Sequence, residues 1–358
     1  MSVVPFPVSS ILPAASGGPP AVWHALAPLC APPLSGRCSP KTHYRADRGT
    51  SKPSRARRNP PKGVTVKPYA TWKAHGSHVP DLLFAGDGQI LVSAGMDNAV
   101  HLWAVTGWSR LSTLEGHTHS VNAIALSADG RALATGSSDA TVRLWTFPEG
   151  EVRQILQDRK RVVSDVTFSP DGRWVAAASY GGRVAVWTLD GEPVTGFAAG
   201  KRNLTTVAFS PDGRMMAAGG LGSQVGLWSL PGGELQEALE ADPTAVLSLA
   251  FIDRGKVLVS LGYEGSIRLW DTGTWHERRS VQVDAEGPRR LVLFGDEKHA
   301  AVCVAGQVQL WSTVRWECAH VLDIGPKSVE AAAFSPDGRW LAVGAADGRI
   351  RVWDLTSL

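Results

Sequence analysis

Short runs in which apolar residues alternate with polar or small residues occupy most of the chain, and one tryptophan recurs at the end of such a run. The runs end in HLW, RLW, AVW, GLW, RLW, QLW and RVW, at Trp103, Trp145, Trp187, Trp228, Trp270, Trp311 and Trp353. Successive tryptophans are 42, 42, 41, 42, 41 and 42 residues apart. A period of this length indicates one structural unit copied seven times.

Each repeat predicts four short β-strands. In the second repeat the alternating run Val121–Leu126 leads into the turn Ser127–Gly130, and two further strands are expected over Ala132–Thr135 and Thr141–Trp145. Asp-Gly between alternating apolar runs is a strong hairpin signal, because glycine tolerates the positive φ that such turns need. A fourth strand follows each tryptophan. Helical periodicity is absent, so the predicted fold class is all-β, built from four-stranded antiparallel sheets.

Seven four-stranded sheets of this kind predict a seven-bladed β-propeller, in which each blade buries its faces against two neighbours. The period, the Gly-His pair at Gly116 and His117, the Ser-Pro-Asp-Gly turns and the terminal tryptophan occur in a constant order. In these features the sequence resembles the WD-repeat family of β-propellers, over about 295 residues. Only two of the repeat tryptophans are followed by aspartate, at Asp271 and Asp354.

The two ends of the repeat region predict how the ring closes. Only Asp354–Leu358 follow the last repeat tryptophan, which is too short for the fourth strand of the seventh blade. The segment Val64–Trp72 has the spacing of a fourth strand but precedes the first blade. We expect it to pair beside the strand Ile350–Trp353 and to close the ring, which would remove two exposed sheet edges.

Residues 1–62 differ in composition from the repeats. They hold nine basic residues against Asp47 alone, a net charge of +8, which leaves 27 basic and 32 acidic residues for the remaining chain. They also hold 12 of the 23 prolines. We expect a disordered, Pro-rich basic tail over 1–62 and a propeller over 63–358, because the tail has too little apolar surface to offset its ordering entropy. The basic stretch Arg55–Arg58 is the one feature that suggests nucleic acid as a partner, through this tail only.

The tail also bears on localisation. A secretory signal is disfavoured, because no Lys or Arg precedes Arg37 and prolines interrupt the apolar run. An organellar transit peptide is the alternative, since the segment is poor in acids and rich in serine, although its prolines oppose an amphipathic helix. We expect a cytoplasmic protein, and no membrane span, since no uncharged apolar run of about 18 residues occurs.

One polar set occurs with identical spacing in the first two repeats. Its members are His75, Ser93, Asp97 and Trp103, and then His117, Thr135, Asp139 and Trp145. Serine, histidine and aspartate are the residue types of a hydrolase triad. A nucleophile, however, needs a cleft and an oxyanion hole, and it has no need of a threonine copy one blade later. No catalytic residue is therefore expected.

The family resemblance implies that each set is instead a buried structural chain, in which the indole N–H donates to the hydroxyl, the hydroxyl to histidine, and histidine to aspartate. The other five repeats depart from this pattern. At the histidine position they carry Arg159, Lys201 (displaced by one residue), Asp242, Val283 and Gly325. Of these five, only the fifth repeat keeps the hydroxyl, Ser260, and only the seventh keeps the aspartate, Asp347. We expect these blades to rely on the packing of tryptophan and aliphatic residues.

Metal and cofactor sites are not expected. No Cys/His pair has zinc-ligand spacing, and Cys303 and Cys318 are predicted to lie on strands too far apart for a disulfide, as small buried residues. His75 with His78, and His117 with His119, have spacings that resemble metal ligands. One histidine of each pair is already assigned to a polar chain, so no metal is predicted there.

The resemblance implies that the loops leading into each blade and the turns that carry the aspartate position share one face, where partners usually bind. The loops leading into the third and fourth repeats place five cations on adjacent blades: Arg159, Lys160, Arg161, Lys201 and Arg202. The neighbouring turns carry Tyr180, Leu221 and Tyr263 at one equivalent position. Aromatic anchors beside Arg and Lys are typical of interaction hot spots, so an acidic peptide or protein segment is the expected partner. Solvated loops without a partner are the alternative.

The sequence therefore predicts a non-catalytic protein-interaction scaffold, with a monomeric propeller. A ligand-binding or enzymatic propeller that uses the central channel is a second hypothesis. The innermost predicted strands are mainly small and apolar, with Asp165 and Glu330 as exceptions, which disfavours that hypothesis. Binding of a polyanion through the basic tail is a third hypothesis, which predicts an affinity that falls steeply with salt.

Overall fold

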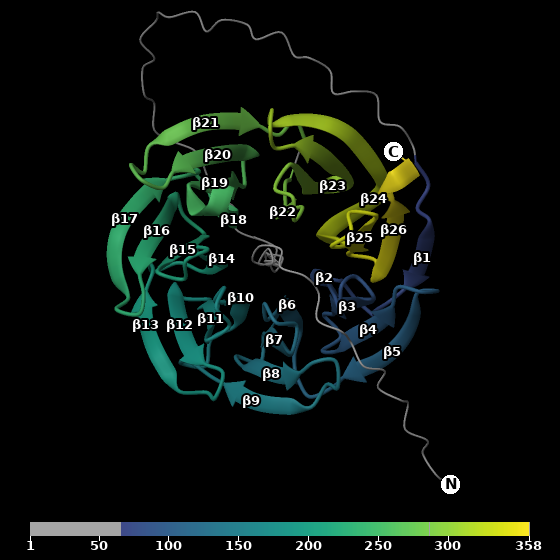
Figure 1. The fold of residues 1–358 in the computed structure, drawn as a ribbon, viewed down its shortest axis with the longest axis horizontal. Coiled ribbons are helices and arrows are strands. Elements are labelled where there is room, and N and C mark those ends of the chain that lie inside the picture. The colour runs from purple at the N-terminus through teal and green to yellow at the C-terminus, as the bar shows by residue number, and fades with distance from the viewer. Residues whose placement is uncertain (1–65, 286, 358) are drawn as a thin grey trace, which may run out of the picture.

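The computed structural model describes residues 66–285 and 287–357, so the predicted tail over 1–62 lies outside the described residues. Figure 1 shows short strands grouped into blades around a central axis. Apart from two short 3₁₀ helices, Asp253–Gly255 and Leu355–Ser357, the regular structure of the described chain is entirely β. Neither helix is long and apolar enough to cross a membrane. The predicted all-β propeller is confirmed.

Five blades are separate four-stranded antiparallel sheets, whose strands follow the chain from the axis to the rim. Blade one comprises β2 (Asp81–Ala85), β3 (Ile90–Ala94), β4 (Val100–Ala104) and β5 (Ser109–Leu114). Blade two comprises β6 (Val121–Leu126), β7 (Ala132–Ser137), β8 (Val142–Thr146) and β9 (Val152–Leu156). Blade three comprises β10 (Val163–Phe168), β11 (Trp174–Ser179), β12 (Arg183–Thr188) and β13 (Pro193–Ala198). Blade four comprises β14 (Leu204–Phe209), β15 (Met215–Gly220), β16 (Gln224–Ser229) and β17 (Glu234–Glu240). Blade five comprises β18 (Val246–Ile252), β19 (Val257–Gly262), β20 (Ser266–Asp271) and β21 (Glu277–Gln282).

Blades six and seven are hydrogen-bonded to each other in one six-stranded sheet of order β1-β26-β25-β24-β23-β22. Its strands are β22 (Arg290–Leu293), β23 (His299–Ser312), β24 (Glu317–Phe334), β25 (Trp340–Ala345), β26 (Arg349–Asp354) and β1 (Ala70–Lys73). The long strand β24 forms the rim of blade six and then, without a break, the inner strand of blade seven. Gly325 stands at the histidine position of the connecting segment. Gly325 lies at φ of 87°, and the register shifts across it, since Asp323 pairs with Gln307 and Ser328 pairs with Ala305 of blade six.

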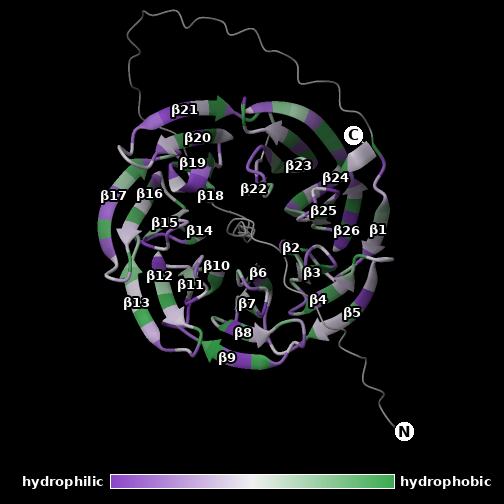
Figure 2. Cartoon of the chain, in the orientation of Figure 1, coloured by the Kyte–Doolittle hydropathy of each residue, from purple (hydrophilic) through white to green (hydrophobic). Residues whose placement is uncertain are grey.

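Seven clusters of buried apolar residues lie between the blades, one at each seam between neighbours. In every case the repeat tryptophan packs into the seam with the preceding blade. Trp145, for example, lies with Leu83 and Val92 of blade one, and Trp103 lies with Ala331 and Ala342 of blade seven. Figure 2 shows bands of hydrophilic and hydrophobic residues along the rim strands. The apolar core is therefore divided into seams, so each blade depends on both of its neighbours.

The ring closes as predicted, by pairing of β1 with β26. The register joins Ala70 to Val352 and Lys73 to Arg349. Within the described residues the strand begins at Ala70, after Pro68, which lacks the N–H that a ladder position needs, and it ends at Lys73, one residue beyond the predicted end. The Tyr69 ring packs on Trp340 at a centroid distance of 4.9 Å, although the residue is 65% exposed. Trp72 is half-buried between Trp103 and Trp108, each at 5.5 Å.

Removal of β1 should destabilise the whole ring. Without residues 66–73, blade seven loses its rim strand and the seam at Trp103 loses the Trp72 ring, which leaves an open sheet edge. We expect a large fall in the melting temperature and aggregation on size-exclusion chromatography. Deletion of residues 1–62 alone is the control, and equal melting of the two deletion variants would contradict closure by β1.

Candidate functional site

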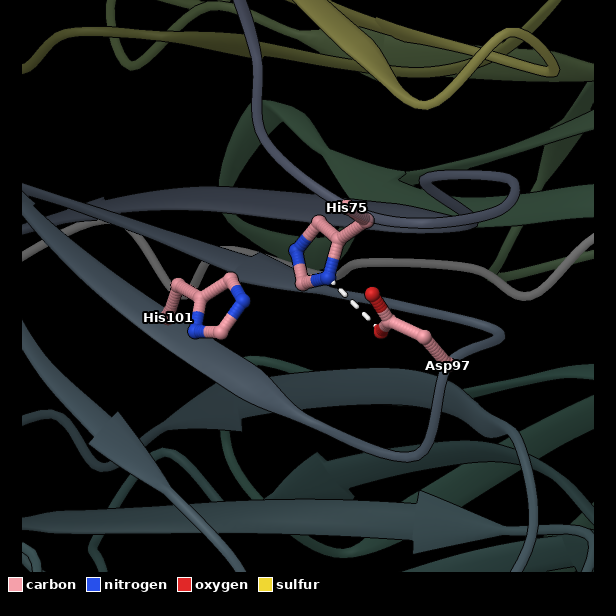
Figure 3. Close-up of side chains that lie close together, drawn as sticks. All are labelled: His75, Asp97 and His101. Carbon is pink, nitrogen blue, oxygen red and sulfur yellow. Dashed lines mark hydrogen bonds and ion pairs between the residues drawn. The ribbon is translucent and has the colours of Figure 1, made fainter.

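A continuous hydrogen-bonded chain crosses blade one. The Trp103 indole N–H donates to Ser93 Oγ at 2.9 Å, and Ser93 Oγ lies 2.8 Å from His75 Nε2. His75 Nδ1 lies 2.9 Å from Asp97 Oδ1, as Figure 3 shows, and Asp97 Oδ2 accepts the Gly76 N–H at 2.7 Å. One direction satisfies every member: the indole donates to the hydroxyl, the hydroxyl to Nε2, and Nδ1–H to the carboxylate. The loop leading into blade one is thereby tied to its second and third strands.

Blade two repeats the arrangement with a threonine. Trp145 Nε1 donates to Thr135 Oγ1 at 3.0 Å, and Thr135 Oγ1 lies 2.6 Å from His117 Nε2. His117 Nδ1 lies 2.8 Å from Asp139 Oδ2, and Thr141 donates to the other carboxylate oxygen from both its backbone and its side chain. The structure thus brings together all eight residues singled out from the sequence, four in each blade.

The electrostatics of the blade-one chain favour an ionised Asp97 and a neutral His101. Burial acts to raise the pKa of Asp97, but the hydrogen bond and charge attraction of His75 outweigh it and lower that pKa to about 2. His101, which the sequence analysis did not single out, stacks on His75 with ring centroids 4.4 Å apart. Burial and the His75 charge lower the pKa of His101 to about 4. Burial also lowers the pKa of His117 in blade two.

These groups lack the access that catalysis needs. Ser93 and Thr135 are fully buried, and each hydroxyl oxygen already contacts an indole N–H and an imidazole nitrogen. At Gly95 an added Cβ would collide with the His75 ring and the Asp97 carboxylate, so backbone fills the space beside the chain. A nucleophile needs an open approach for its substrate. The arrangement is instead suited to satisfying buried polar groups.

His75, Asp97 and His101 also form a group of three metal-binding residue types, with ligand atoms within 4.8 Å of one another (Figure 3). Both ring nitrogens of His75 are engaged, by Asp97 and Ser93, and His101 Nδ1 lies 3.0 Å from Thr113 Oγ1. A metal would have to displace bonds of the polar chain. The expectation that no metal binds here stays a prediction.

The expectation that the other five blades rely on the packing of tryptophan and aliphatic residues is wrong for blade five. Asp242, at the histidine position, is 2% exposed, and its carboxylate accepts the N–H groups of Thr244, Ala245 and Glu264 at 2.9–3.3 Å. The Ser266 hydroxyl donates to it at 3.1 Å. A carboxylate can fix the loop by accepting N–H groups directly, so histidine is not required. In blade three, Asp158 pairs instead with Arg183.

The innermost strands carry polar groups that sequence reasoning largely missed. Asp81 accepts the Ile124 N–H of the next blade at 2.8 Å, and Asp165 likewise accepts the Val207 N–H at 2.8 Å. Burial raises the pKa of Asp81 to about 7 against the attraction of Arg290, and burial also raises the pKa of Asp165.

Arg290 of blade six lies 2.7 Å from Asp81 of blade one and donates to the Pro80 carbonyl at 3.0 Å. Both charged side chains are at most 1% exposed. Because Arg290 and Asp81 are 209 positions apart in the chain, no local pattern indicates their pairing. These groups join blades to one another around the axis.

The predicted partner-binding residues lie where the loops leading into blades three and four meet the neighbouring turns. All five cations, Arg159, Lys160, Arg161, Lys201 and Arg202, are exposed. The three turn residues share one position, since each backbone N–H donates to the carbonyl eighteen residues earlier: Tyr180 to Val162, Leu221 to Asn203 and Tyr263 to Ala245. Leu221 is 38% exposed and Tyr263 51% exposed, whereas Tyr180 is half-buried.

Comparison with known proteins identifies related sequences. The family described as the IFT122 first beta-propeller matches residues 78–354. The chain is 32% identical over 101 residues to the target of rapamycin complex subunit wat1 of Schizosaccharomyces pombe. The aligned segment covers 28% of this chain and 32% of that protein. It is 30% identical over 103 residues to the target of rapamycin complex subunit LST8 of Saccharomyces cerevisiae. The aligned segment covers 28% of this chain and 34% of that protein.

A further relative is transducin beta-like protein 3 of Bos taurus, 30% identical over 133 residues, which covers 35% of this chain and 16% of that protein. The matched segments therefore span about a third or less of the length of these three relatives.

Substitution of Asp97 by alanine should destabilise the propeller by about 1–3 kcal/mol, because it leaves the His75 ring and the Gly76 N–H without their acceptor. Chemical denaturation gives this difference in the free energy of unfolding. Glu151→Ala, which removes an exposed carboxylate of blade two, is the matched control and should change stability little. Equal stability of the two variants would contradict a structural role for the hydrogen-bonded polar chain of blade one.

Acidification should destabilise the protein through His101. Its folded-state pKa of about 4 lies below its ordinary value of 6.5, so the unfolded chain binds more protons between these limits. The contribution of His101 to the free energy of unfolding is complete above pH 6.5 and is lost as the pH falls towards 4. Denaturation midpoints measured across this window should show a weaker pH dependence in His101→Gln than in the parent protein. An unchanged slope would show that His101 does not contribute.

Proposed function

The chain belongs to the family of the IFT122 first beta-propeller, a family of WD-repeat propellers, and we propose that it is a non-catalytic scaffold that binds an acidic segment of a partner protein. WD-repeat propellers related to this chain are typically protein-interaction scaffolds. Two of the relatives are, by name, subunits of a target of rapamycin complex, and so belong to an assembly of proteins. For this chain, the loop face of blades three and four is the proposed binding surface.

The observation that carries the proposal is the uncompensated charge of these loops. Asp158 is the one acid of its loop, and it is already paired with Arg183. Within the described residues, none of the five loop cations lies within ion-pair distance of a carboxylate. A partner carboxylate or phosphate would therefore meet guanidinium and ammonium groups without first breaking an internal ion pair, which favours rapid and salt-sensitive association.

The backbone of the same loops supports a preformed display of these cations. Arg159 and Lys160 both lie in the left-handed region, at φ of 50°, which non-glycine residues rarely adopt. Strained conformations of this kind concentrate at functional sites, because the surrounding fold must maintain them. Gly181 of the neighbouring turn donates its N–H to Asn203 Oδ1 at 3.0 Å, so the turn of blade three is fixed to the loop leading into blade four.

Exposed apolar surface completes the proposed site. Leu221 and Tyr263 extend it from the cationic loops towards blade five. Glu240 of blade four and Glu264 of blade five are exposed and acidic, so the positive surface ends there. A peptide with acidic residues followed by an apolar or aromatic residue matches this order of charge and hydrophobicity.

Catalysis has less support than binding. The serine, histidine and aspartate of blade one are engaged within the polar chain. On the innermost strands, Asp81 and Asp165 are at most 1% exposed and accept backbone N–H groups, and Glu330 is 4% exposed. The third hypothesis, polyanion binding through the basic tail, falls on residues outside the described part of the chain.

Charge reversal tests the proposed surface. Lys160→Glu with Arg202→Glu should abolish capture of the partner by the full-length protein in affinity purification. Arg131→Glu with Arg214→Glu is the matched control, since these exposed arginines lie in turns between first and second strands, at the opposite ends of the strands. Retention of every partner by the first pair of substitutions would refute the proposed surface, provided both variants melt like the parent protein.

A further inference from the structure

In four blades the turn between the second and third strands holds an acid at the aspartate position, and a group of the same blade binds that acid. The four acids are Asp97, Asp139, Glu264 and Asp347, of blades one, two, five and seven. Asp97 and Asp139 accept hydrogen bonds from the histidines of their loops. Glu264 accepts the Thr244 hydroxyl at 3.0 Å, and Asp347 lies 2.8 Å from the Arg351 guanidinium. The aspartate position is therefore where a blade supplies its own carboxylate to the loop face.

Blades three and four carry glycine at this position instead, Gly181 and Gly222. These are also the two blades whose loops carry the five exposed cations. Blade six lacks the acid as well, at Ala305, but its loop has the apolar Val283 at the histidine position. Blades three and four thus combine a loop rich in cations with a turn that has lost its own carboxylate.

The arginine of each loop lies beside the place where the missing side chain would begin. A Cβ atom added at Gly181 would lie 3.8 Å from Arg161 Nε, and one added at Gly222 would lie 3.9 Å from Arg202 Cδ. A carboxylate begins one carbon beyond Cβ, so an acid in either turn would meet a guanidinium, as Asp97 meets His75 in blade one. Because glycine has no side chain, the space beside each guanidinium stays open to an acid from outside the chain.

One residue connects the two places. The Arg202 carbonyl oxygen would lie 2.8 Å from a Cβ atom added at Gly182, next to Gly181, while the same residue's side chain reaches Gly222. Gly182 is buried, so the loop leading into blade four packs directly on the turn of blade three. The two places are therefore about one arginine residue apart. Alternate side chains of an extended peptide share one face and are about 7 Å apart, which suits this separation.

We propose that the loop face of blades three and four binds an extended segment with two acidic side chains at alternate positions. Its two carboxylates take the places of the missing turn acids, one beside Arg161 and one beside Arg202. This inference rests on the proposed function and specifies the ligand, since a single acid or two widely separated acids would leave one guanidinium unpaired. Charge-assisted hydrogen bonds to arginine are short and about twice as strong as neutral ones, so each acid contributes substantially.

An acid built into the turn of blade three should compete with the ligand. Gly181→Asp supplies the missing carboxylate beside Arg161. Gly181→Asn is the matched control, because asparagine has the same shape and both residues tolerate the positive φ of 86° at this position. The probe is a fluorescein-labelled peptide with two glutamates at alternate positions followed by tyrosine, and its binding to the full-length protein is measured by fluorescence anisotropy. Gly181→Asp should weaken the affinity about tenfold relative to Gly181→Asn, which corresponds to the loss of one charge-assisted contact.

The outcomes separate this inference from the proposed function. Equal affinity of the two Gly181 variants would refute the assigned place of the acid, and so would a parent protein that binds the peptide no better than its diglutamine analogue. If Lys160→Glu with Arg202→Glu still abolishes partner capture in either case, the binding surface stands and only the assigned ligand fails. If that pair of substitutions leaves capture intact, the proposed function fails too.

Thermal melting provides a readout that needs no ligand. In low-salt buffer Gly181→Asp should melt at a higher temperature than Gly181→Asn, because its carboxylate gains the Arg161 guanidinium as a partner. The difference should disappear when both variants also carry Arg161→Gln, as a double-mutant cycle requires for a direct pair. Equal melting of the two single variants, or a difference that survives Arg161→Gln, would show that Arg161 does not serve this place and would overturn the inference.

Discussion

Burial of the repeat tryptophan in the seam with the preceding blade is the interaction on which the whole ring depends. Each of these indoles packs against the strands of a neighbouring sheet, as Trp145 does on Leu83 and Val92. Truncation of a buried aromatic side chain typically costs about 3–5 kcal/mol. An isolated blade would expose the indole together with two apolar faces, and it would not be stable alone. Cooperativity between neighbouring blades, and hence the need for a closed circle, follows from this geometry.

The indole N–H imposes a second constraint, because each buried donor needs an acceptor. Ser93, Thr135 and Ser260 provide it in blades one, two and five, at 2.9–3.0 Å. In blade six the acceptor is the Gln309 side chain, and in blade seven it is the Val66 carbonyl. The last of these joins the two ends of the ring. The chain segment that closes the propeller therefore also satisfies the tryptophan of the blade that it completes.

The predicted polar chains of blades one and two were accessible from sequence because their spacing is fixed by short strands and tight turns. Asp242 has the same spacing, but a search for histidine overlooks a carboxylate that accepts the same loop N–H groups directly. His101 was missed because its stacking on His75 depends on side-chain packing across the sheet. The exposure of the five loop cations follows from their place at the ends of strands, whereas the pairing of Asp158 with Arg183 became evident only in three dimensions.

The sequence by itself determined the number of blades, their strand order and the use of the N-terminal strand, because a 42-residue period with a terminal tryptophan admits few arrangements that bury every sheet face. Tertiary structure alone decided the contacts between distant blades. Arg290 meets Asp81 because ring closure brings the inner strands of blades six and one near the same axis, and their pairing compensates two buried charges. The two ends of the described chain likewise meet at the seam of blades six and seven, where Val66 and Leu355 pack against the same apolar cluster.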